Sequence, residues 1–377
     1  MLRVERISEA GFASMSNDWG ACLAASDSNP LFMSWPWLYS WWETWSQLLG
    51  MELMLLGAFD ENNELVGIGP FSRRVLVTAG GVRVTRLYIL GNAWRLAPTV
   101  RTEYCGIIAC RGYEDAVGDV LLSALEQLGW DELICTDVPP EQVEHLERAG
   151  AGFDGRGYRV IQRAADVGGR VDTRGRFTDW LSGLGKNTRL KAYNRRTYLQ
   201  KQGNLSFSDH NAGSDGDFFE LLNAFHHQRW GKPAFEREAL RFHRLLLQRL
   251  HLCGGEPALS VVRYNGRCIS VLYDVVVREC RFNLQAGYNE SFDAKVSLGY
   301  LHLGYAIEEA FSAEKICSYD LLAGTGKKQF YKAHFHGEAV HFATFQVVRG
   351  PLLKLLYSIQ SASPPFIARA FIRRVGL

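Results

Sequence analysis

The sequence predicts an α/β protein (α+β mixed sheet) of two domains, each a central mixed β-sheet flanked by helices. Its 377 residues exceed the usual size of one domain. A strand-like run at 280–285, a helical run at 300–313 and an apolar strand at 316–322 form one βαβ unit. The two halves share a succession of helix, hairpin, strand, helix and strand, which favours a tandem duplication.

The first half contains a tryptophan-rich helix at 31–50, with Pro36 in the position typical of a first helical turn. Aromatic side chains mostly supply buried area, so packing in the core is favoured over stacking on a ligand. The other predicted elements of this half are strands at 53–59, 65–71, 85–90, 133–138 and 158–162 and helices at 114–128 and 141–149.

A linker is predicted at 166–176, where glycine, arginine and aspartate are frequent and apolar periodicity is weak. The second half adds helices at 218–230 and 238–250, strands at 259–264 and 268–277 around an Asn-Gly turn, the βαβ unit, and a strand at 341–348. The predicted domains are therefore residues 1–165, residues 166–350 with the catalytic cleft, and a helical tail at 351–377.

Composition argues against several classes of protein. The net charge of +2 is too small for a general nucleic-acid binder, so DNA is not an expected partner. The 8 cysteines are scattered without a Cys-x-x-Cys pair, which favours free thiols in a reducing compartment. The first residues lack the apolar core of a secretory signal, and the apolar run at 53–59 is too short to span a bilayer. A cytoplasmic protein is expected.

Several short motifs follow one another in an order that resembles the GNAT acyltransferase superfamily. The likeness is to its double-GNAT branch, the CelD/BcsL-like acetyltransferases, and more distantly to the Fem aminoacyltransferases. The motifs lie at 184–189, 195–196, 226–230, 285–288, 297–299, 319–320 and 331–332. The usual pyrophosphate signature of the superfamily is not met, and its nearest match lies at 295–301.

This resemblance implies two tandem GNAT-like domains and an N-acyltransferase. The donor co-substrate would be an acyl-CoA, and the acceptor a small-molecule amine such as an amino sugar or a precursor of a cell-envelope polysaccharide. Transfer would be direct, without a covalent enzyme intermediate. Two alternatives stay open: a Fem-like aminoacyltransferase with charged tRNA as donor, and a non-catalytic, degenerate GNAT pair that serves as a binding module.

Acyl transfer from a thioester to an amine requires a polarised carbonyl, a neutral amine and a stabilised thiolate. In a GNAT-type fold, the carbonyl meets backbone N–H groups where two central strands part. Here the resemblance places that gap between the strand ending near Gln285, Ala286 and Gly287 and the strand at 316–322. Glycine at 287 would let a ligand approach the backbone, whereas a simple strand-end turn is the alternative.

The residues that open the predicted helix are candidates for binding coenzyme A. Ser297, Leu298 and Gly299 would offer backbone N–H groups to its phosphates. A plain helix cap explains the same residues equally well, and the family resemblance favours the phosphate site.

Four residues are candidates for catalysis. Asp320 would hold the acceptor ammonium or take its proton, Tyr331 would protonate the leaving thiolate, and Lys332 would neutralise phosphate or oxyanion charge. His226 is a candidate base or substrate contact. The alternatives are a structural pair with a lysine for Asp320, packing and solvation of a loop for Tyr331 and Lys332, and a buried, hydrogen-bonded histidine for His226. His226 and its neighbour His227 point about 100° apart on a helix, so no metal site is expected.

The candidate substrate-binding residues are Lys186, Arg189, Arg195, Arg196, Trp230 and Tyr288. The four basic ones lie in a window, 180–208, that holds no acidic residue. This favours a phosphate-bearing ligand such as CoA, a nucleotide sugar, a lipid headgroup or tRNA, with a solvated basic helix as the alternative. The tail at 351–377 is a candidate for peripheral membrane contact, although packing back onto the protein is favoured.

Overall fold

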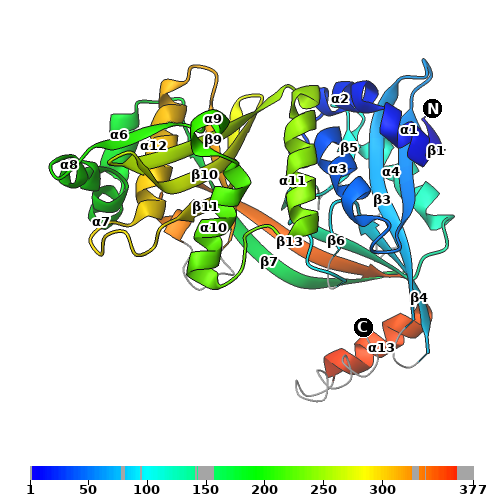
Figure 1. Cartoon of the computed structure of the whole chain (residues 1–377). Coiled ribbons are helices and arrows are strands. Elements are labelled where there is room, and N and C mark those ends of the chain that lie inside the picture. Colours follow the sequence, from blue (N-terminus) through cyan, green and yellow to red (C-terminus); the bar gives the residue numbers. More distant parts are fainter. Residues whose placement is uncertain are drawn as a thin grey trace. The chain divides into compact units, whose positions relative to one another are not determined.

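The computed structural model describes residues 2–77, 81–93, 96–140, 142, 157–324, 331–335 and 337–362. Its contacts divide the chain into two units (Figure 1): unit 1 consists of residues 1–165 and 341–377, and unit 2 of residues 166–340. Each unit contains a mixed sheet with flanking helices, so the predicted α/β class is confirmed.

Unit 1 is built on an antiparallel meander, β1 to β4, followed by a helix and a strand that runs parallel to β4. Its elements are β1 (Arg3–Ile7), α1 (Glu9–Ser14), α2 (Ser16–Ala24), α3 (Trp35–Trp45), β2 (Glu52–Phe59), β3 (Leu65–Val77), β4 (Arg83–Ile89), β5 (Ile108–Ala109), α4 (Glu114–Glu126), β6 (Glu132–Val138), β13 (Glu338–Val348) and α13 (Pro351–Ala362). The first residues of β7 (Arg159–Asp172) also lie here.

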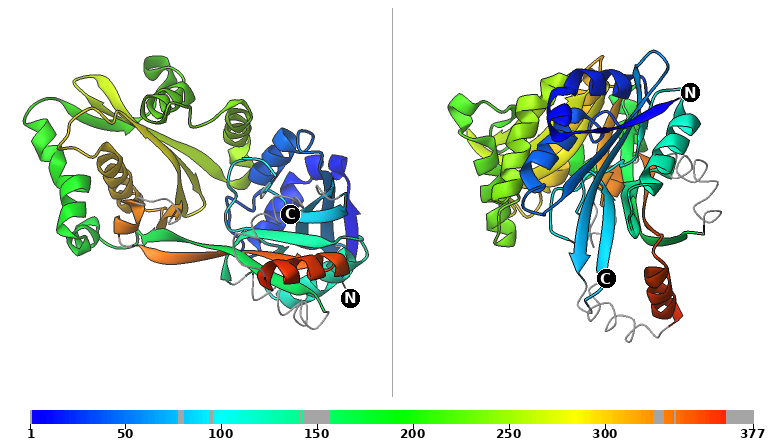
Figure 2. Two further views of the ribbon diagram at one scale, coloured as in Figure 1. Left: turned by 90° about the horizontal axis from the view of Figure 1, so that it is seen from below. Right: turned by 90° about the vertical axis from the view of Figure 1, so that its right-hand side faces the viewer.

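Unit 2 repeats this order with β8 to β11, a helix and a strand parallel to β11. Its elements are α6 (Phe177–Gly183), α7 (Lys186–Arg189), η1 (Leu190–Asn194), α8 (Arg195–Gln200), β8 (Leu205–Asp209), α9 (Ala212–Asp215), α10 (Phe218–Trp230), α11 (Arg237–Arg249), η2 (Leu250–Cys253), β9 (Gly255–Tyr264), β10 (Arg267–Val277), β11 (Cys280–Tyr288), α12 (Leu298–Ser312), β12 (Ser318–Ala323) and η3 (Tyr331–Phe335). In this unit α12 covers one face of the sheet, and α10 and α11 cover the other (Figure 2).

Each unit is completed by a strand from the other half of the sequence. β13 follows β12 in the chain but pairs antiparallel with β6, whereas β7 follows β6 but pairs antiparallel with β12. The sequence assigned residues 341–350 to the second domain and 351–377 to a separate tail. The structure instead groups both with unit 1, because β13 completes the sheet there and α13 buries Leu353 and Tyr357 against Val84 and Val348.

The predicted linker at 166–176 is wrong over most of its length, since β7 runs through it to Asp172. Glycine is needed inside this strand because the backbone of β12 comes close. A Cβ atom on Gly168 would lie 3.1 Å from the carbonyl carbon of Leu322. Gly168 therefore marks a close approach between two strands, and the glycines of this segment obscured the strand pattern in the sequence.

The tryptophan-rich helix is α3, and it packs in the core as predicted. Its N-cap is Ser34, whose hydroxyl accepts a hydrogen bond from the N–H of Trp37, and Pro36 lies in the first turn. All five of its tryptophans are buried. The indole N–H of Trp35 donates to the carbonyl of Phe12 at 2.6 Å, which ties α3 to α1.

Candidate active site

The predicted βαβ unit is present in unit 2 as β11, α12 and β12. β11 and β12 are parallel, and their pairing starts at Cys280 opposite Ser318 and ends at Phe282 opposite Asp320. β11 nevertheless continues to Tyr288. The two central strands therefore part beyond Phe282, as the family resemblance implied, and full-length pairing between them is excluded over the described residues.

A β-bulge lies on each strand at the point where they part. On β11, Leu284 is the extra residue, because Tyr273 of β10 pairs with Gln285 and Asp274 pairs with Asn283. On β12, the register against β7 shifts between Asp320 and Ala323. Bulges bend a strand and re-aim its side chains, so the two bulges account for the divergence of the strands.

The bulge in β12 includes a strained residue. Leu322 has a φ of 61°, in the left-handed region that is unfavourable for a leucine. Its N–H donates to Oδ1 of Asp320 at 2.8 Å, and a guanidinium nitrogen of Arg170 lies 3.5 Å from the other carboxylate oxygen. Asp320 is fully buried. Its carboxylate thus stabilises the bulge, which is a structural task beside the catalytic one predicted for it.

Lys332 of η3 bridges the parted strands. Its Nζ donates to the carbonyl of Leu321 at 2.8 Å and lies 3.5 Å from the carbonyl of Asn283. These carbonyls belong to the first residues beyond the last pair of β12 and β11, respectively. The ammonium therefore lies where the next backbone hydrogen bonds of the ladder would otherwise form, and it brings a positive charge into the gap.

Another candidate residue, His226, binds β11 further along the gap. Nε2 of His226, on α10, lies 2.9 Å from the carbonyl oxygen of Ala286. A carbonyl only accepts, so Nε2 carries the proton and Nδ1 is the basic nitrogen of the neutral ring. The N–H of Ala286 donates to the side-chain oxygen of Gln285 at 3.1 Å. His226, Gln285, Ala286 and Lys332 are thus brought together along one stretch of β11.

The presence of glycine at position 287 is explained by packing, which was not predicted from the sequence. A Cβ atom there would lie 3.0 Å from Cδ1 of Leu222 and 3.2 Å from the carbonyl oxygen of the same residue. Close packing of β11 against α10 accounts for this glycine, so the interpretation that it admits a ligand to the backbone is not needed to explain it.

The first turn of α12 is covered by Tyr288. A Cβ atom on Gly299 would lie 3.0 Å from the Tyr288 ring, and the hydroxyl of that ring accepts a hydrogen bond from Arg229 at 2.5 Å. Ser297 is the N-cap, but its side chain makes no capping hydrogen bond, and Leu298 is buried. Burial raises the pKa of Tyr288, so its hydroxyl stays protonated and neutral near pH 7.

Two other candidate residues, Trp230 and Tyr331, lie in α10 and η3, respectively. Trp230 lies at the end of α10 with 59% of its surface exposed, and Arg229 stacks on its ring. The backbone of Tyr331 lies in η3, and the side chain is outside the described residues.

The acid-free basic window does have an acidic partner, which corrects the inference that its charges are unmatched. Arg196 is buried and pairs with Glu308 of α12, and its guanidinium lies 3.5 Å from the centre of the Tyr305 ring. Residues on a distant helix supply this pairing, so local sequence could not show it. Arg189 donates to the carbonyl of Ser182 at 2.9 Å.

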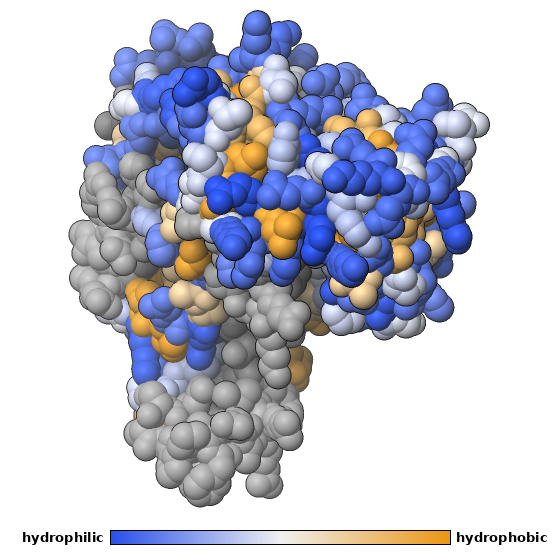
Figure 3. Space-filling model, turned by 90° about the vertical axis from the view of Figure 1, so that its left-hand side faces the viewer, coloured by the Kyte–Doolittle hydropathy of each residue, from blue (hydrophilic) through white to orange (hydrophobic). Residues whose placement is uncertain are grey.

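The other basic residues of the window are more accessible. Lys186 is exposed, and Arg195 stacks on the Tyr198 ring. Figure 3 shows the side of the molecule that includes α6 to α8, where hydrophilic residues predominate and hydrophobic residues form small, separate patches. A phosphate-binding role for Lys186 and Arg195 stays a prediction.

A buried polar cluster that was not predicted from the sequence lies beneath the gap. Asp274 of β10 accepts hydrogen bonds from Arg281 at 2.7 Å, Asn283 at 2.7 Å and Tyr319 at 2.6 Å. Arg281 also pairs with Glu309 of α12 at 2.5 Å. Burial alone would lower the pKa of Arg281, but the charge of Asp274 and the other partners outweigh burial and raise it. The alternation of polar residues in β10 and β11 was the only signal available.

The corresponding gap in unit 1 is filled by the chain itself. Parallel pairing of β4 and β6 ends at Tyr88. Beyond it, the hydroxyl of Thr102 donates to the carbonyl of Gly91 at 2.5 Å, and the N–H of Cys105 donates to the carbonyl of Asp137 at 3.1 Å. Residues at the two ends of this segment therefore satisfy backbone carbonyls beyond the ends of β4–β6 pairing. For this reason the candidate site is the gap in unit 2.

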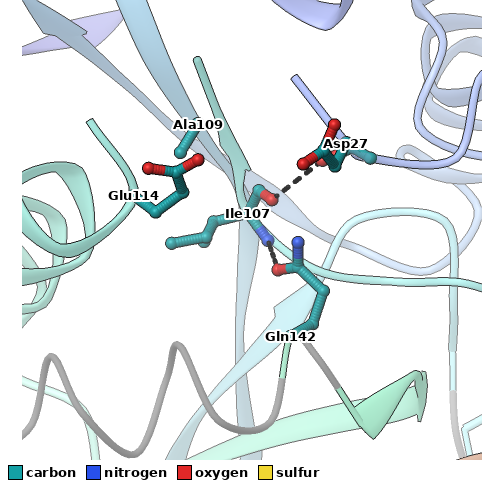
Figure 4. A pocket seen from close by; sticks show the side chains of 6 residues that line it. Asp27, Ile107, Ala109, Glu114 and Gln142 are labelled. Atoms are coloured by element: carbon teal, nitrogen blue, oxygen red, sulfur yellow. Dashed lines mark hydrogen bonds between the residues drawn. The ribbon is translucent and has the colours of Figure 1, made fainter. Parts of the chain in front are cut away.

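A small pocket in unit 1 lies apart from the predicted residues (Figure 4). The N–H of Ile107 donates to Oε1 of Gln142 at 3.2 Å inside it. Its lining residues are Asp27, Ser28, Ile107, Ala109, Glu114 and Gln142. Within the described part of the chain, no group of three or more His, Cys, Asp or Glu side chains is placed to hold a metal ion.

Residues 186–333 match the family model of the acetyltransferase (GNAT) domain. This segment contains the gap between β11 and β12 and most of unit 2. With this match, the prediction of a GNAT-type acyltransferase is confirmed. Unit 1 repeats the order of elements seen in the matched unit, and the prediction of two GNAT-like domains is confirmed as well.

Solved structures resemble the whole chain at low sequence identity. FemX is 11% identical with a TM-score of 0.59, over 90% of this chain and 96% of that one. A conserved protein of unknown function from Bacteroides thetaiotaomicron is 10% identical with a TM-score of 0.54, over 93% and 100%. A tandem GNAT protein from the clavulanic acid biosynthesis pathway is 10% identical with a TM-score of 0.44, over 93% and 99%. No curated protein matches the chain.

Proposed function

We propose that this chain is an N-acyltransferase that moves an acyl group from acyl-CoA directly to an amine in unit 2. The observation that carries the proposal is the end of β11–β12 pairing at Phe282 and Asp320, while β11 continues to Tyr288. A gap of this kind exposes backbone groups to a ligand inside a sheet, where fixed N–H donors polarise a carbonyl effectively.

The reaction assigns a task to each group along the gap. The thioester oxygen accepts a hydrogen bond from the backbone N–H of Ala286. In the structure this N–H donates to the side-chain oxygen of Gln285, so the position accommodates an oxygen acceptor. The amine nitrogen attacks the carbonyl carbon, the carbon–sulfur bond breaks, and the amine loses a proton. Nδ1 of His226 is the proposed acceptor of that proton, since its Nε2–H is committed to Ala286.

The donor's phosphates and the leaving thiolate need positive charge and hydrogen-bond donors. The free N–H groups in the first turn of α12, at Leu298 and Gly299, would bind the pyrophosphate once the Tyr288 ring turns aside. Lys332 supplies a cation inside the gap. Tyr331 is adjacent to it in sequence and remains the proposed proton donor to the thiolate.

Binding and turnover test the proposal together. Isothermal titration with acetyl-CoA and longer acyl-CoAs is expected to show one site per chain. Release of free coenzyme A thiol should then depend on an added amine, with amino sugars and other small amines as the panel. Absence of heat with every acyl-CoA, together with absence of thiol release, contradicts the proposal.

A Fem-like aminoacyltransferase is the second candidate, favoured by the likeness to FemX and by the unmatched pyrophosphate signature. Charged tRNA would then replace acyl-CoA as donor. Its binding should weaken steeply with salt and should be lost on neutralising Lys186 and Arg195. Arg196 is the matched control, because its charge is already paired with Glu308. Salt-independent or absent tRNA binding leaves acyl-CoA as the donor.

The finer predictions stay proposals. They comprise membership of the CelD/BcsL branch and an amino-sugar or cell-envelope acceptor. Membrane contact through 351–377 is a further proposal. α13 exposes Leu352, Leu355 and Ile359, and residues 363–377 lie outside the described part. Among the described residues, no helix is both long enough and apolar enough to cross a membrane.

A further inference from the structure

Asp274 of unit 2 lies where side chains of three neighbouring strands meet. It lies on β10 opposite Asn283, immediately beside the bulge that Leu284 makes in β11. Its carboxylate is fully buried and receives hydrogen bonds from side chains of β11 and of β12. One carboxylate therefore ties three neighbouring strands together at the bulge.

The cluster lies directly below the gap. Arg281 and Tyr319, which both donate to Asp274, are opposite each other in the second-last pair of β11 and β12. Asn283 donates its side-chain amide to Asp274 at 2.7 Å, and its backbone carbonyl is the one that faces Lys332 at 3.5 Å. The position of the Lys332 ammonium thus depends on residues that Asp274 holds.

We infer that Asp274 is a positioning residue for acyl transfer, which fixes where β11 and β12 part by holding Asn283 and Tyr319. This inference rests on the proposed function of the gap. Asp274 does not contact the acyl group. It acts through the two strand ends whose carbonyls, at Asn283 and Leu321, bind Lys332.

A general packing role would place such a cluster anywhere in the core, and its loss would lower stability without a specific effect on the gap. The side chains that donate to Asp274 instead come from the second-last pair before the strands separate, Arg281 and Tyr319, and from Asn283, the first residue of β11 beyond the last pair. Preorganised groups lose their advantage when their supports move by as little as about 1 Å, which makes the rate sensitive to this cluster.

The test removes one hydroxyl. Tyr319→Phe deletes the bond from β12 to Asp274 and leaves the carboxylate bound by Arg281 and Asn283. Tyr273→Phe is the matched control, because this tyrosine is equally buried in the same sheet, on the neighbouring strand β10, and its hydroxyl contacts His243 of α11 instead of Asp274. We expect Tyr319→Phe to lower kcat about tenfold, as loss of one hydrogen bond at a site does, with KM for acyl-CoA unchanged. Tyr273→Phe should leave both values unchanged.

A second readout does not need activity. Amide hydrogen exchange of residues 283–288 in the ligand-free protein should be faster in Tyr319→Phe than in the wild type, and unchanged in Tyr273→Phe. Equal exchange and equal kinetics in the two variants overturn the inference. If the wild type proves inactive, the proposed function fails while the exchange experiment still decides the role of Asp274. Asn283→Ala gives the same comparison should Tyr319→Phe not fold.

Discussion

Nζ of Lys332 lies 2.8 Å from the carbonyl oxygen of Leu321, in the position that the next rung between β11 and β12 would occupy. A lysine here has two effects: it satisfies backbone oxygens that lost their strand partner, and it brings a positive charge to the place where the proposed reaction develops negative charge.

Replacing this lysine should therefore separate catalysis from folding. Lys332→Met is expected to lower kcat about 10²-fold, as loss of a group that stabilises transition-state charge does, with a smaller effect on donor KM. Lys315→Met is the control, since that lysine is exposed in the same unit. Steady-state kinetics on both variants give the comparison. Equal activity of the two would show that the ammonium is only structural.

His226 should respond to replacement in a manner that reveals its chemistry. His226→Gln keeps a hydrogen-bond donor near the position of Nε2 for the carbonyl of Ala286 but has no basic nitrogen. Both His226→Gln and His226→Ala should lose about 10²-fold or more in kcat/KM if Nδ1 accepts the amine proton. His227→Ala, at an exposed neighbouring position, should not. Full activity in His226→Gln alone would mean that the histidine positions β11 and moves no proton.

Two glycines in helices should give stability changes of opposite sign when replaced by alanine. Gly20 in α2 has nothing within 4 Å of the added Cβ, so alanine should stabilise the protein by about 1 kcal/mol. A Cβ on Gly304 in α12 would lie 2.3 Å from the carbonyl oxygen of Ala192, and the backbone cannot yield easily. Gly304→Ala should therefore destabilise by about 1–3 kcal/mol. Denaturant unfolding measures both, and stabilisation by Gly304→Ala would contradict the tight contact of α12 with η1.

Stability should fall as the pH drops below about 6.5, through His243 and His302. Burial lowers the pKa of each to about 3. The unfolded chain then binds protons that the folded protein cannot, so stability is present above pH 6.5 and is lost between pH 6.5 and 3. From pH 7 to pH 5 each histidine should remove about 2 kcal/mol.

A variant isolates one of these contributions. Both ring nitrogens of His302 contact hydroxyls, Ser260 at 3.0 Å and Ser270 at 2.7 Å, so its replacement disturbs two strands. Nδ1 of His243 lies 3.2 Å from the hydroxyl of Tyr273, and His243→Asn keeps a hydrogen-bonding group near that position. Unfolding of His243→Asn across this range should show a shallower loss of stability than the wild type, and an identical slope would contradict the assignment.

Local pattern was sufficient to predict the unit around the gap. A strand-like run, a serine–glycine turn, a helical run and a second, apolar strand predicted β11, α12 and β12, and these elements are present within a few residues of the predicted bounds. Such elements depend on neighbours in sequence, and the sequence contains that information directly.

The pairing of strands that are distant in sequence could not be predicted, for a physical reason. Nothing local distinguishes a strand that pairs with its own repeat from one that pairs with the other, so the partners of β7 and β13 were not predicted. The same limit hid the pairing of Arg196 with Glu308 and the cluster around Asp274, because the partners come from separate elements. Residues already singled out, such as His226 and Lys332, do meet at the gap.

The most direct test of the central claim is amide hydrogen exchange measured with and without saturating acetyl-CoA. The account predicts slower exchange in residues 283–288 of β11 and in the first turn of α12, at 297–301, with little change in unit 1. Protection confined to unit 1, or none along β11, would show that the gap between the parted strands is not where the donor binds.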